Sequence, residues 1–166
     1  MKTQDALSLL VALEERVARI YFQFFRAFRG DPVIGRCWWE MAQEEYGHAG
    51  ILKMVRELVP ADMDFGEVGA RLWALVETVE WCEQQARDVG TLARALELAI
   101  RLESSELDAL GRRIIQALGT DLPEGATRSF SSTDAHYRHL VEAAGKVSDR
   151  RIRERLNAML GGAHES

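Results

Sequence analysis

Glu45-Tyr46-Gly47-His48 lies near the middle of a long apolar-periodic segment and decides the fold. Residues at positions i and i+3 of an α-helix project from the same face, so this carboxylate and this imidazole can share one metal ion. Leu52 continues the apolar stripe one turn after His48. The stretch therefore predicts a long helix that turns two metal-ligand side chains toward a core.

Three other apolar-periodic segments also carry an acidic or imidazole side chain at a position where the apolar face of the helix would be expected to have a hydrophobic residue. These residues are Glu14, Glu103 with Glu106, and His136. A buried lone carboxylate is costly, and it persists when it is paired, protonated or bound to a metal. Four antiparallel helices would bring all of these candidates, together with the first pair, to one level of one core.

The inward residue of the first segment is Glu14 if the stripe runs through Leu10, Val17 and Tyr21. Glu15 lies one position round the helix and would point inward if the stripe were displaced by one residue. The periodicity favours Glu14 and leaves Glu15 as the alternative.

Composition predicts one all-α domain covering residues 1–166. A chain of 166 residues that is 47% hydrophobic has the apolar surface for one continuous core. Only three Pro are present, and Leu, Ala, Glu and Arg, which favour helices, are frequent. No segment shows the pattern of a strand.

Charge and cysteine content exclude several classes of protein. The net charge of −5 argues against nucleic acid as a partner, and the arginines within 150–155 indicate a solvated helix face. Cys37 and Cys82 form no CxxC pair, so neither a zinc ribbon nor a rubredoxin-type iron site can be built from them. No segment approaches ~18 consecutive apolar residues, and no cleavable leader is evident. We therefore expect a cytoplasmic protein without a membrane partner.

Start and stop signals divide the chain into six expected helices. The break at Gly30-Asp31-Pro32 is short, which makes the first two helices antiparallel neighbours. The expected ranges are 3–29, 32–59, a crossover helix at about 66–89, 91–118, 124–145 and a short C-terminal helix at about 147–160.

The candidate ligands favour particular metals. Carboxylate oxygens mixed with imidazole, and no thiolate, favour iron or manganese over structural zinc. We expect a site of this kind to hold two metal ions bridged by carboxylates. They could bind peroxide or O₂ and deliver two electrons together.

The chain resembles the ferritin-like superfamily and, within it, the rubrerythrin-type proteins. The matching segments are 13–21, 45–49, 102–106 and 136–140. The resemblance implies an antiparallel four-helix bundle with a helical crossover between its second and third helices. It also implies a non-haem di-iron centre with Glu14, Glu45, His48, Glu103 and His136 as ligands and Glu106 as an auxiliary one.

Two departures from this pattern limit what the resemblance implies. Thr133 stands where the second ExxH motif of the family has its Glu, which removes an expected bridging carboxylate. Glu106 or Asp134 could replace it, or the site holds one metal or none. No rubredoxin-type CxxC domain follows, so a peroxidase would need a separate electron-donor protein.

Two functions of different classes follow from these observations. The first is a cytoplasmic, homodimeric di-iron or manganese protein that acts on peroxide or O₂, as a rubrerythrin-like peroxidase, or oxidises iron. The alternative is a non-catalytic helical scaffold or binding protein with a degenerate metal site. In the scaffold, Arg101, Arg138 or the histidines pair with the inward carboxylates.

Overall fold

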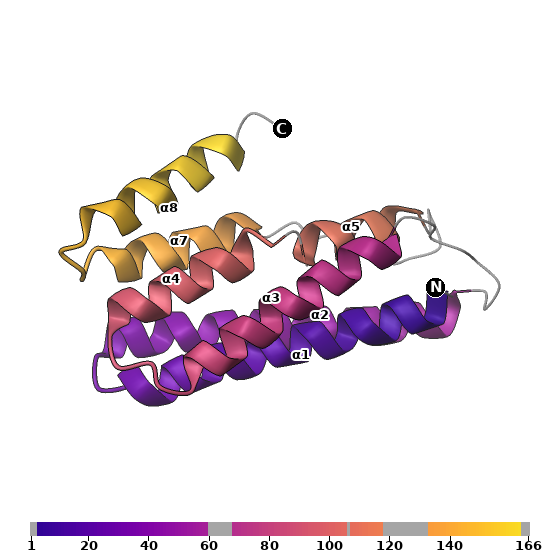
Figure 1. Ribbon diagram of the computed structural model, residues 1–166, viewed down its shortest axis with the longest axis horizontal. Helices are drawn as coiled ribbons and strands as arrows, with labels where there is room; N and C mark the ends of the chain where they lie inside the picture. The colour runs from indigo at the N-terminus through magenta and orange to yellow at the C-terminus, as the bar shows by residue number, and fades with distance from the viewer. Residues whose placement is uncertain (1–2, 60–67, 106, 118–132, 164–166) are drawn as a thin grey trace.

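The structure is a computed structural model that describes residues 3–59, 68–105, 107–117 and 133–163. Every regular element in these ranges is an α-helix, which confirms the predicted all-α class. The helices, coloured along the chain in Figure 1, are α1 (Thr3–Phe28), α2 (Pro32–Leu58), α3 (Val68–Ala86), α4 (Leu92–Glu103), α5 (Leu107–Ala117), α7 (Thr133–Ala144) and α8 (Arg150–Ala163).

A tight turn joins α1 to α2 and fixes them as an antiparallel pair. Asp31 caps α2, since its carboxylate accepts hydrogen bonds from the backbone N–H of Val33 at 2.9 Å and of Ile34 at 3.2 Å. The helices approach closely beyond the turn, because a Cβ at Gly35 would lie 3.1 Å from the Cα of Arg29. The local sequence therefore supplies both the cap and the small residue that this hairpin needs.

Contacts between the helices form a closed ring. α1 makes its most extensive contact with α2, α2 also contacts α7, and α4 contacts both α7 and α1. α3 packs outside this ring against α1 and α4, and α8 packs on α7 and α4, on the side away from α1 and α2 (Figure 1). The largest fully buried apolar side chains include Leu7, Leu10, Leu13, Phe24, Trp38, Met41, Leu52 and Leu96.

The prediction of one continuous helix over 91–118 is wrong. α4 ends at Glu103, and α5 begins at Leu107. At the break the Ser104 hydroxyl donates to the Ile100 carbonyl and the Ser105 hydroxyl to the Leu102 carbonyl, each at 2.5 Å. Serine side chains that bond nearby carbonyls compete with the helical backbone, which gives a physical reason for the interruption.

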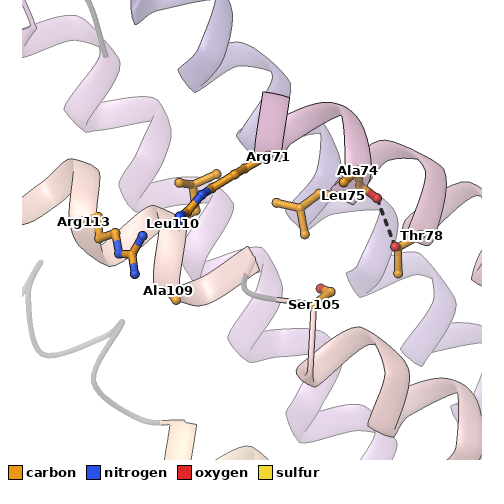
Figure 2. Close-up of a pocket in the computed structure, with 8 residues that line it drawn as sticks. All are labelled: Arg71, Ala74, Leu75, Thr78, Ser105, Ala109, Leu110 and Arg113. Carbon is orange, nitrogen blue, oxygen red and sulfur yellow. Dashed lines mark hydrogen bonds between the residues drawn. The ribbon is translucent and has the colours of Figure 1, made fainter. Parts of the chain in front are cut away.

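The other helix boundaries agree closely with expectation where the structure describes them. α3 lies within the range of about 66–89 expected for the third helix, and α8 begins and ends three residues later than expected. α7 begins at Thr133, and residues 124–132 of the expected helix lie outside the described residues. α3 and α5 leave a small cavity between them (Figure 2). None of the described helices combines the length and apolarity of a membrane-spanning segment.

Candidate metal centre

The α1–α2 hairpin brings Glu14 to the level of Glu45 and His48. Glu14 precedes Gly30 by 16 residues, and Glu45 follows it by 15. Each helix rises by about 1.5 Å per residue, so equal distances from the turn give equal heights along the pair. Both segments turn these side chains toward the shared core, as their apolar stripes require.

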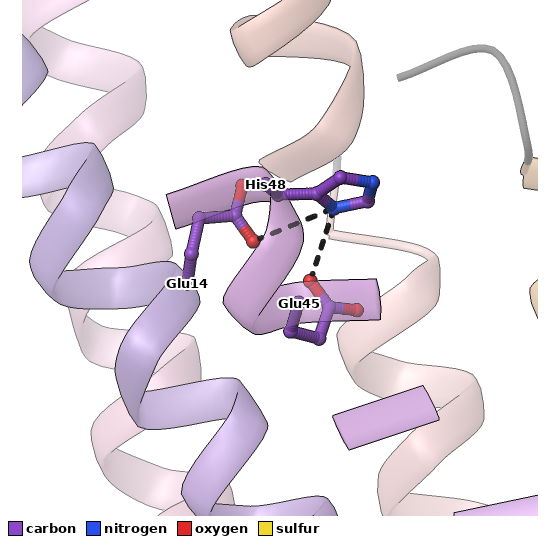
Figure 3. Close-up of side chains that lie close together, drawn as sticks. All are labelled: Glu14, Glu45 and His48. Carbon is purple, nitrogen blue, oxygen red and sulfur yellow. Dashed lines mark hydrogen bonds and ion pairs between the residues drawn. The ribbon is translucent and has the colours of Figure 1, made fainter. Parts of the chain in front are cut away.

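The three side chains form one buried cluster (Figure 3). The His48 Nδ1 atom lies 3.3 Å from Glu45 Oε2 and 4.0 Å from Glu14 Oε2. Their exposed fractions are 0% for Glu14, 2% for Glu45 and 3% for His48, and they are the buried charged or polar residues of the described core. Nδ1 is therefore the imidazole nitrogen that faces both carboxylates.

The cluster fits a metal ion in geometry and in charge. One potential ligand atom from each residue lies within 4.8 Å of the others. Bonds from a metal to imidazole nitrogen or carboxylate oxygen are about 2.0–2.2 Å long, so opposite ligands of one ion lie about 4 Å apart. Small rotations of these side chains would bring their ligand atoms to the distances that one ion requires. Two buried carboxylates repel each other unless a cation or protons neutralise them, so the group could hold a metal ion.

The structure resolves the choice between Glu14 and Glu15 in favour of Glu14 as the inward residue. Glu15 is half-exposed, and its carboxylate pairs with Lys53 at 2.6 Å on the outside of the hairpin. Glu14 is fully buried and faces His48.

Glu103 is not a member of the three-residue group that the described residues form. It is half-buried at the end of α4, and its Oε1 accepts a hydrogen bond of 2.5 Å from the Tyr21 hydroxyl. Tyr21 lies two turns after Glu14 on the same face of α1. Contrary to expectation, the helix that carries Glu103 does not continue beyond it, because α4 ends at Glu103 and the next described helix begins at Leu107.

Two predicted ligands cannot be placed. Glu106 lies outside the described residues. His136 lies in the first turn of α7, where the side chains of Thr133 and His136 are likewise outside the described part of the chain. Their participation in a metal site stays a prediction.

Aromatic side chains close the core beside Tyr21. The Tyr21 ring stacks on Trp38 with centroids 6.0 Å apart, and the Phe24 and Trp38 rings pack in a T-shaped arrangement with centroids 5.1 Å apart. All three are 0% exposed. Because Tyr21 is fully buried, its hydroxyl is shielded from water, and this shielding strengthens the hydrogen bond to Glu103.

The sequence interpretation missed a second polar group between α2 and α7. His139 Nδ1 lies 3.4 Å from Glu40 Oε2, and its Nε2 lies 3.8 Å from Glu44 Oε1. Glu142, one turn after His139, is half-exposed and faces Arg36 at 3.4 Å. The two carboxylates approach different ring nitrogens of His139, so this group is an interhelical contact rather than a site for one ion. The i, i+4 spacing of Glu40 and Glu44 was the available signal.

Both cysteines are buried, as expected. Burial, with the nearby Glu142 and Glu40 carboxylates, raises the pKa of the Cys37 thiol to about 12. Burial raises the pKa of Cys82 to about 11, partly opposed by nearby Arg101. Both thiols are therefore neutral at neutral pH and poor metal ligands, since a metal binds the thiolate.

The Tyr21 contact gives a test that requires no metal. We expect Tyr21→Phe to lower the free energy of unfolding by about 1–2 kcal/mol, because it leaves the Glu103 carboxylate without this donor. Urea unfolding would measure the change. Tyr46→Phe is the matched control, because Tyr46 is 49% exposed, and it should leave the free energy unchanged. Equal effects of the two substitutions would contradict a stabilising role for this hydrogen bond.

The chain matches no known family model, no curated protein and no solved structure. Its resemblance to the ferritin-like superfamily therefore stays a prediction that rests on the motifs quoted above.

Proposed function

We propose that this chain is a ferritin-like, rubrerythrin-type metalloprotein that binds iron or manganese and acts on peroxide or O₂. The observation that carries the proposal is the joint burial of Glu14, Glu45 and His48, with their ligand atoms within 4.8 Å of one another. This mixture of carboxylate and imidazole suits iron or manganese. The ring formed by α1, α2, α4 and α7 supports an antiparallel four-helix bundle, in which α3 is the crossover helix.

The described residues have distinct parts in this proposal. Glu14 and Glu45 would bind metal through carboxylate oxygens, with Glu45 bridging, and His48 would bind through Nδ1. Tyr21 orients the Glu103 carboxylate through its hydrogen bond. Because Glu103 accepts this hydrogen bond from Tyr21, we propose that it supports the metal ligands from outside. It would bind a metal itself only after its side chain rotates.

A second metal position would need the remaining predicted ligands, Glu103, Glu106 and His136. A carboxylate-bridged pair of iron or manganese ions held by these residues would supply two electrons to peroxide or O₂, and Fe(II) bound there would itself be oxidised in the related reaction. The electrons for repeated turnover would come from a separate donor protein, because the chain has no CxxC pair. We place this chemistry in the cytoplasm.

An exposed aromatic group on the outside of the α1–α2 hairpin supports the proposed homodimer. Trp39 lies 5.3 Å from Phe25 and 6.1 Å from Phe22 between ring centroids. Phe22 is 40% exposed and Trp39 is 42% exposed. A contiguous exposed aromatic patch of this kind favours a protein interface.

One observation favours the alternative of a metal-free scaffold. The 3.3 Å distance between His48 Nδ1 and Glu45 Oε2 would also suit an ion pair with a protonated imidazole. A pair of this kind neutralises one of the two buried carboxylates without any metal. Arg101, which the scaffold interpretation offered as a partner, instead lies over the Trp81 ring at 4.2 Å.

Metal content distinguishes the two functions. We expect protein from iron-supplemented cells to contain about two iron or manganese ions per chain if the full di-metal site forms. A value near one would place the metal on Glu14, Glu45 and His48 alone. Less than about 0.2 ion per chain after reconstitution with Fe(II) would contradict metal binding, because preformed sites load readily.

A matched pair of variants shows whether this metal is bound at the cluster. Glu45→Gln should remove most of it, because it deletes a buried ligand. Glu40→Gln changes the same residue type on the same helix, but Glu40 is half-exposed and faces His139. Retention of full metal content by Glu45→Gln, or equal loss in both variants, would show that the metal lies elsewhere.

A further inference from the structure

A small cavity lies between the N-terminal half of α3 and α5, and it shares no lining residue with the metal cluster. Its volume is about 150 Å³. Apolar side chains, including Leu75 from α3 and Ala109 and Leu110 from α5, form much of its wall. Arg71 and Arg113 also line it (Figure 2). The cavity thus combines an apolar interior with two cationic groups.

The two arginines come from different helices, and both line this cavity. Figure 2 shows the Arg71 side chain extending from α3 toward α5, where Arg113 lies. Within the described ranges, Arg113 makes no hydrogen bond or ion pair. A guanidinium has five N–H donors, so Arg71 can serve its other contacts and still bind a ligand. Two guanidinium groups at one small cavity favour an anion, and their planar forks suit a carboxylate.

The hydroxyl groups of the cavity wall already donate elsewhere. Thr78 Oγ1 donates to the Ala74 carbonyl at 3.0 Å, and Ser105 Oγ donates to the Leu102 carbonyl at 2.5 Å. Their protons are therefore unavailable to an anion. Among the lining side chains, the guanidinium groups are left to bind the charged end of a ligand, and the rest of the ligand would meet mostly apolar surface.

We propose that this cavity binds a small organic acid, with its carboxylate on Arg71 and Arg113 and a short apolar chain against Leu75, Ala109 and Leu110. A cavity of about 150 Å³ can accommodate a six-carbon molecule such as benzene, which limits the chain to about four to six carbons. An inorganic anion would not use the apolar wall. Because the lining residues come from α3, from Ser105 in the α4–α5 break and from α5, the bound acid joins α5 to α3.

Hexanoate is the probe that tests this proposal. We expect saturable binding by isothermal titration calorimetry, with the largest NMR shifts at the methyl groups of Leu75, Ala109 and Leu110. Acetate retains the charge but lacks the chain, and hexan-1-ol retains the chain but lacks the charge. Each should bind about tenfold more weakly or worse, since each loses one of the two contacts. Inorganic phosphate binding as tightly as hexanoate would overturn the choice of a carboxylic acid.

Variants locate the binding site. Arg113→Gln should weaken hexanoate binding by about tenfold or more, because it removes a charge-assisted contact. Ala109→Phe should abolish binding by filling the cavity. The control is the double variant Arg26→Gln with Arg29→Gln, because these arginines line an open concavity toward the other end of α3. Its affinity for hexanoate should equal that of the unmodified protein.

Folding of each variant is checked by circular dichroism, and Arg113→Lys provides a milder substitution if Arg113→Gln unfolds. Lysine retains the charge without the planar fork, so an intermediate affinity is expected. Absence of saturable hexanoate binding to the unmodified protein, or unchanged affinity in folded Arg113 and Ala109 variants, would overturn the proposal. Neither result depends on metal content, so the outcome is distinguishable from that of the proposed redox function.

Discussion

Removal of bound metal should lower the melting temperature of the protein by about 10 °C at neutral pH. A ligand that binds only the folded state adds about 4 kcal/mol to the free energy of unfolding at a thousandfold excess over Kd. For a chain of this size, each kcal/mol corresponds to about 2–4 °C. Calorimetry of chelated and Fe(II)-loaded or Mn(II)-loaded samples would measure the difference.

The difference in melting temperature should narrow as the pH falls. Without metal, Glu14 and Glu45 place two like charges in a buried cluster, and protonation relieves their repulsion. With metal, protons compete for the same carboxylates and for His48, so binding weakens. Acid therefore stabilises the metal-free cluster relative to the loaded one. Identical melting temperatures with and without metal at several pH values would instead favour the scaffold.

The central part of this site could be predicted because it depends on local sequence. Gly30, Asp31 and Pro32 specify a short turn between two long helices, and the turn makes their midpoints adjacent. Once the hairpin is given, helical periodicity places Glu14 opposite Glu45 without any information from the rest of the chain. Both residues are buried as that argument required.

The α4–α5 break could not be predicted by the same periodicity. Helical spacing continues across the break through Leu98, Leu102 and Leu110. The apolar pattern alone therefore predicts one continuous helix. The interruption is associated with Ser104 and Ser105, whose hydroxyls bond carbonyls of the preceding turn. Serine also occurs within intact helices, so its effect depends on packing that the sequence does not show.

Side-chain contacts between helices that are far apart in the sequence could not be predicted either. His139 meets Glu40 and Glu44 because α7 packs on α2, and the register of that packing depends on many core side chains. The partner of Tyr21 posed the same problem. The hydrogen bond from Tyr21 to Glu103 depends on the relative positions of α1 and α4, which the sequence does not show.

Glu14→Gln should weaken metal binding by at least about 100-fold while leaving the metal-free protein as stable as before or more stable. Substitution of residues that only support metal ligands typically costs 10–100-fold in affinity, so loss of a direct ligand should cost at least the upper value. In the metal-free protein, the same substitution removes one of two buried negative charges beside His48. These two effects have opposite signs. A general folding defect would instead lower the stability of both forms.

Glu15→Gln is the control, because it makes the same chemical change one position along the same helix. Glu15 is partly exposed and pairs with Lys53, and such surface pairs contribute about 0–1 kcal/mol. Metal affinity should therefore stay unchanged in this variant. Competition with a fluorescent chelator would measure affinity, and urea unfolding after chelation would measure stability. If Glu15→Gln weakened binding as much as Glu14→Gln, the buried cluster would not be the metal site.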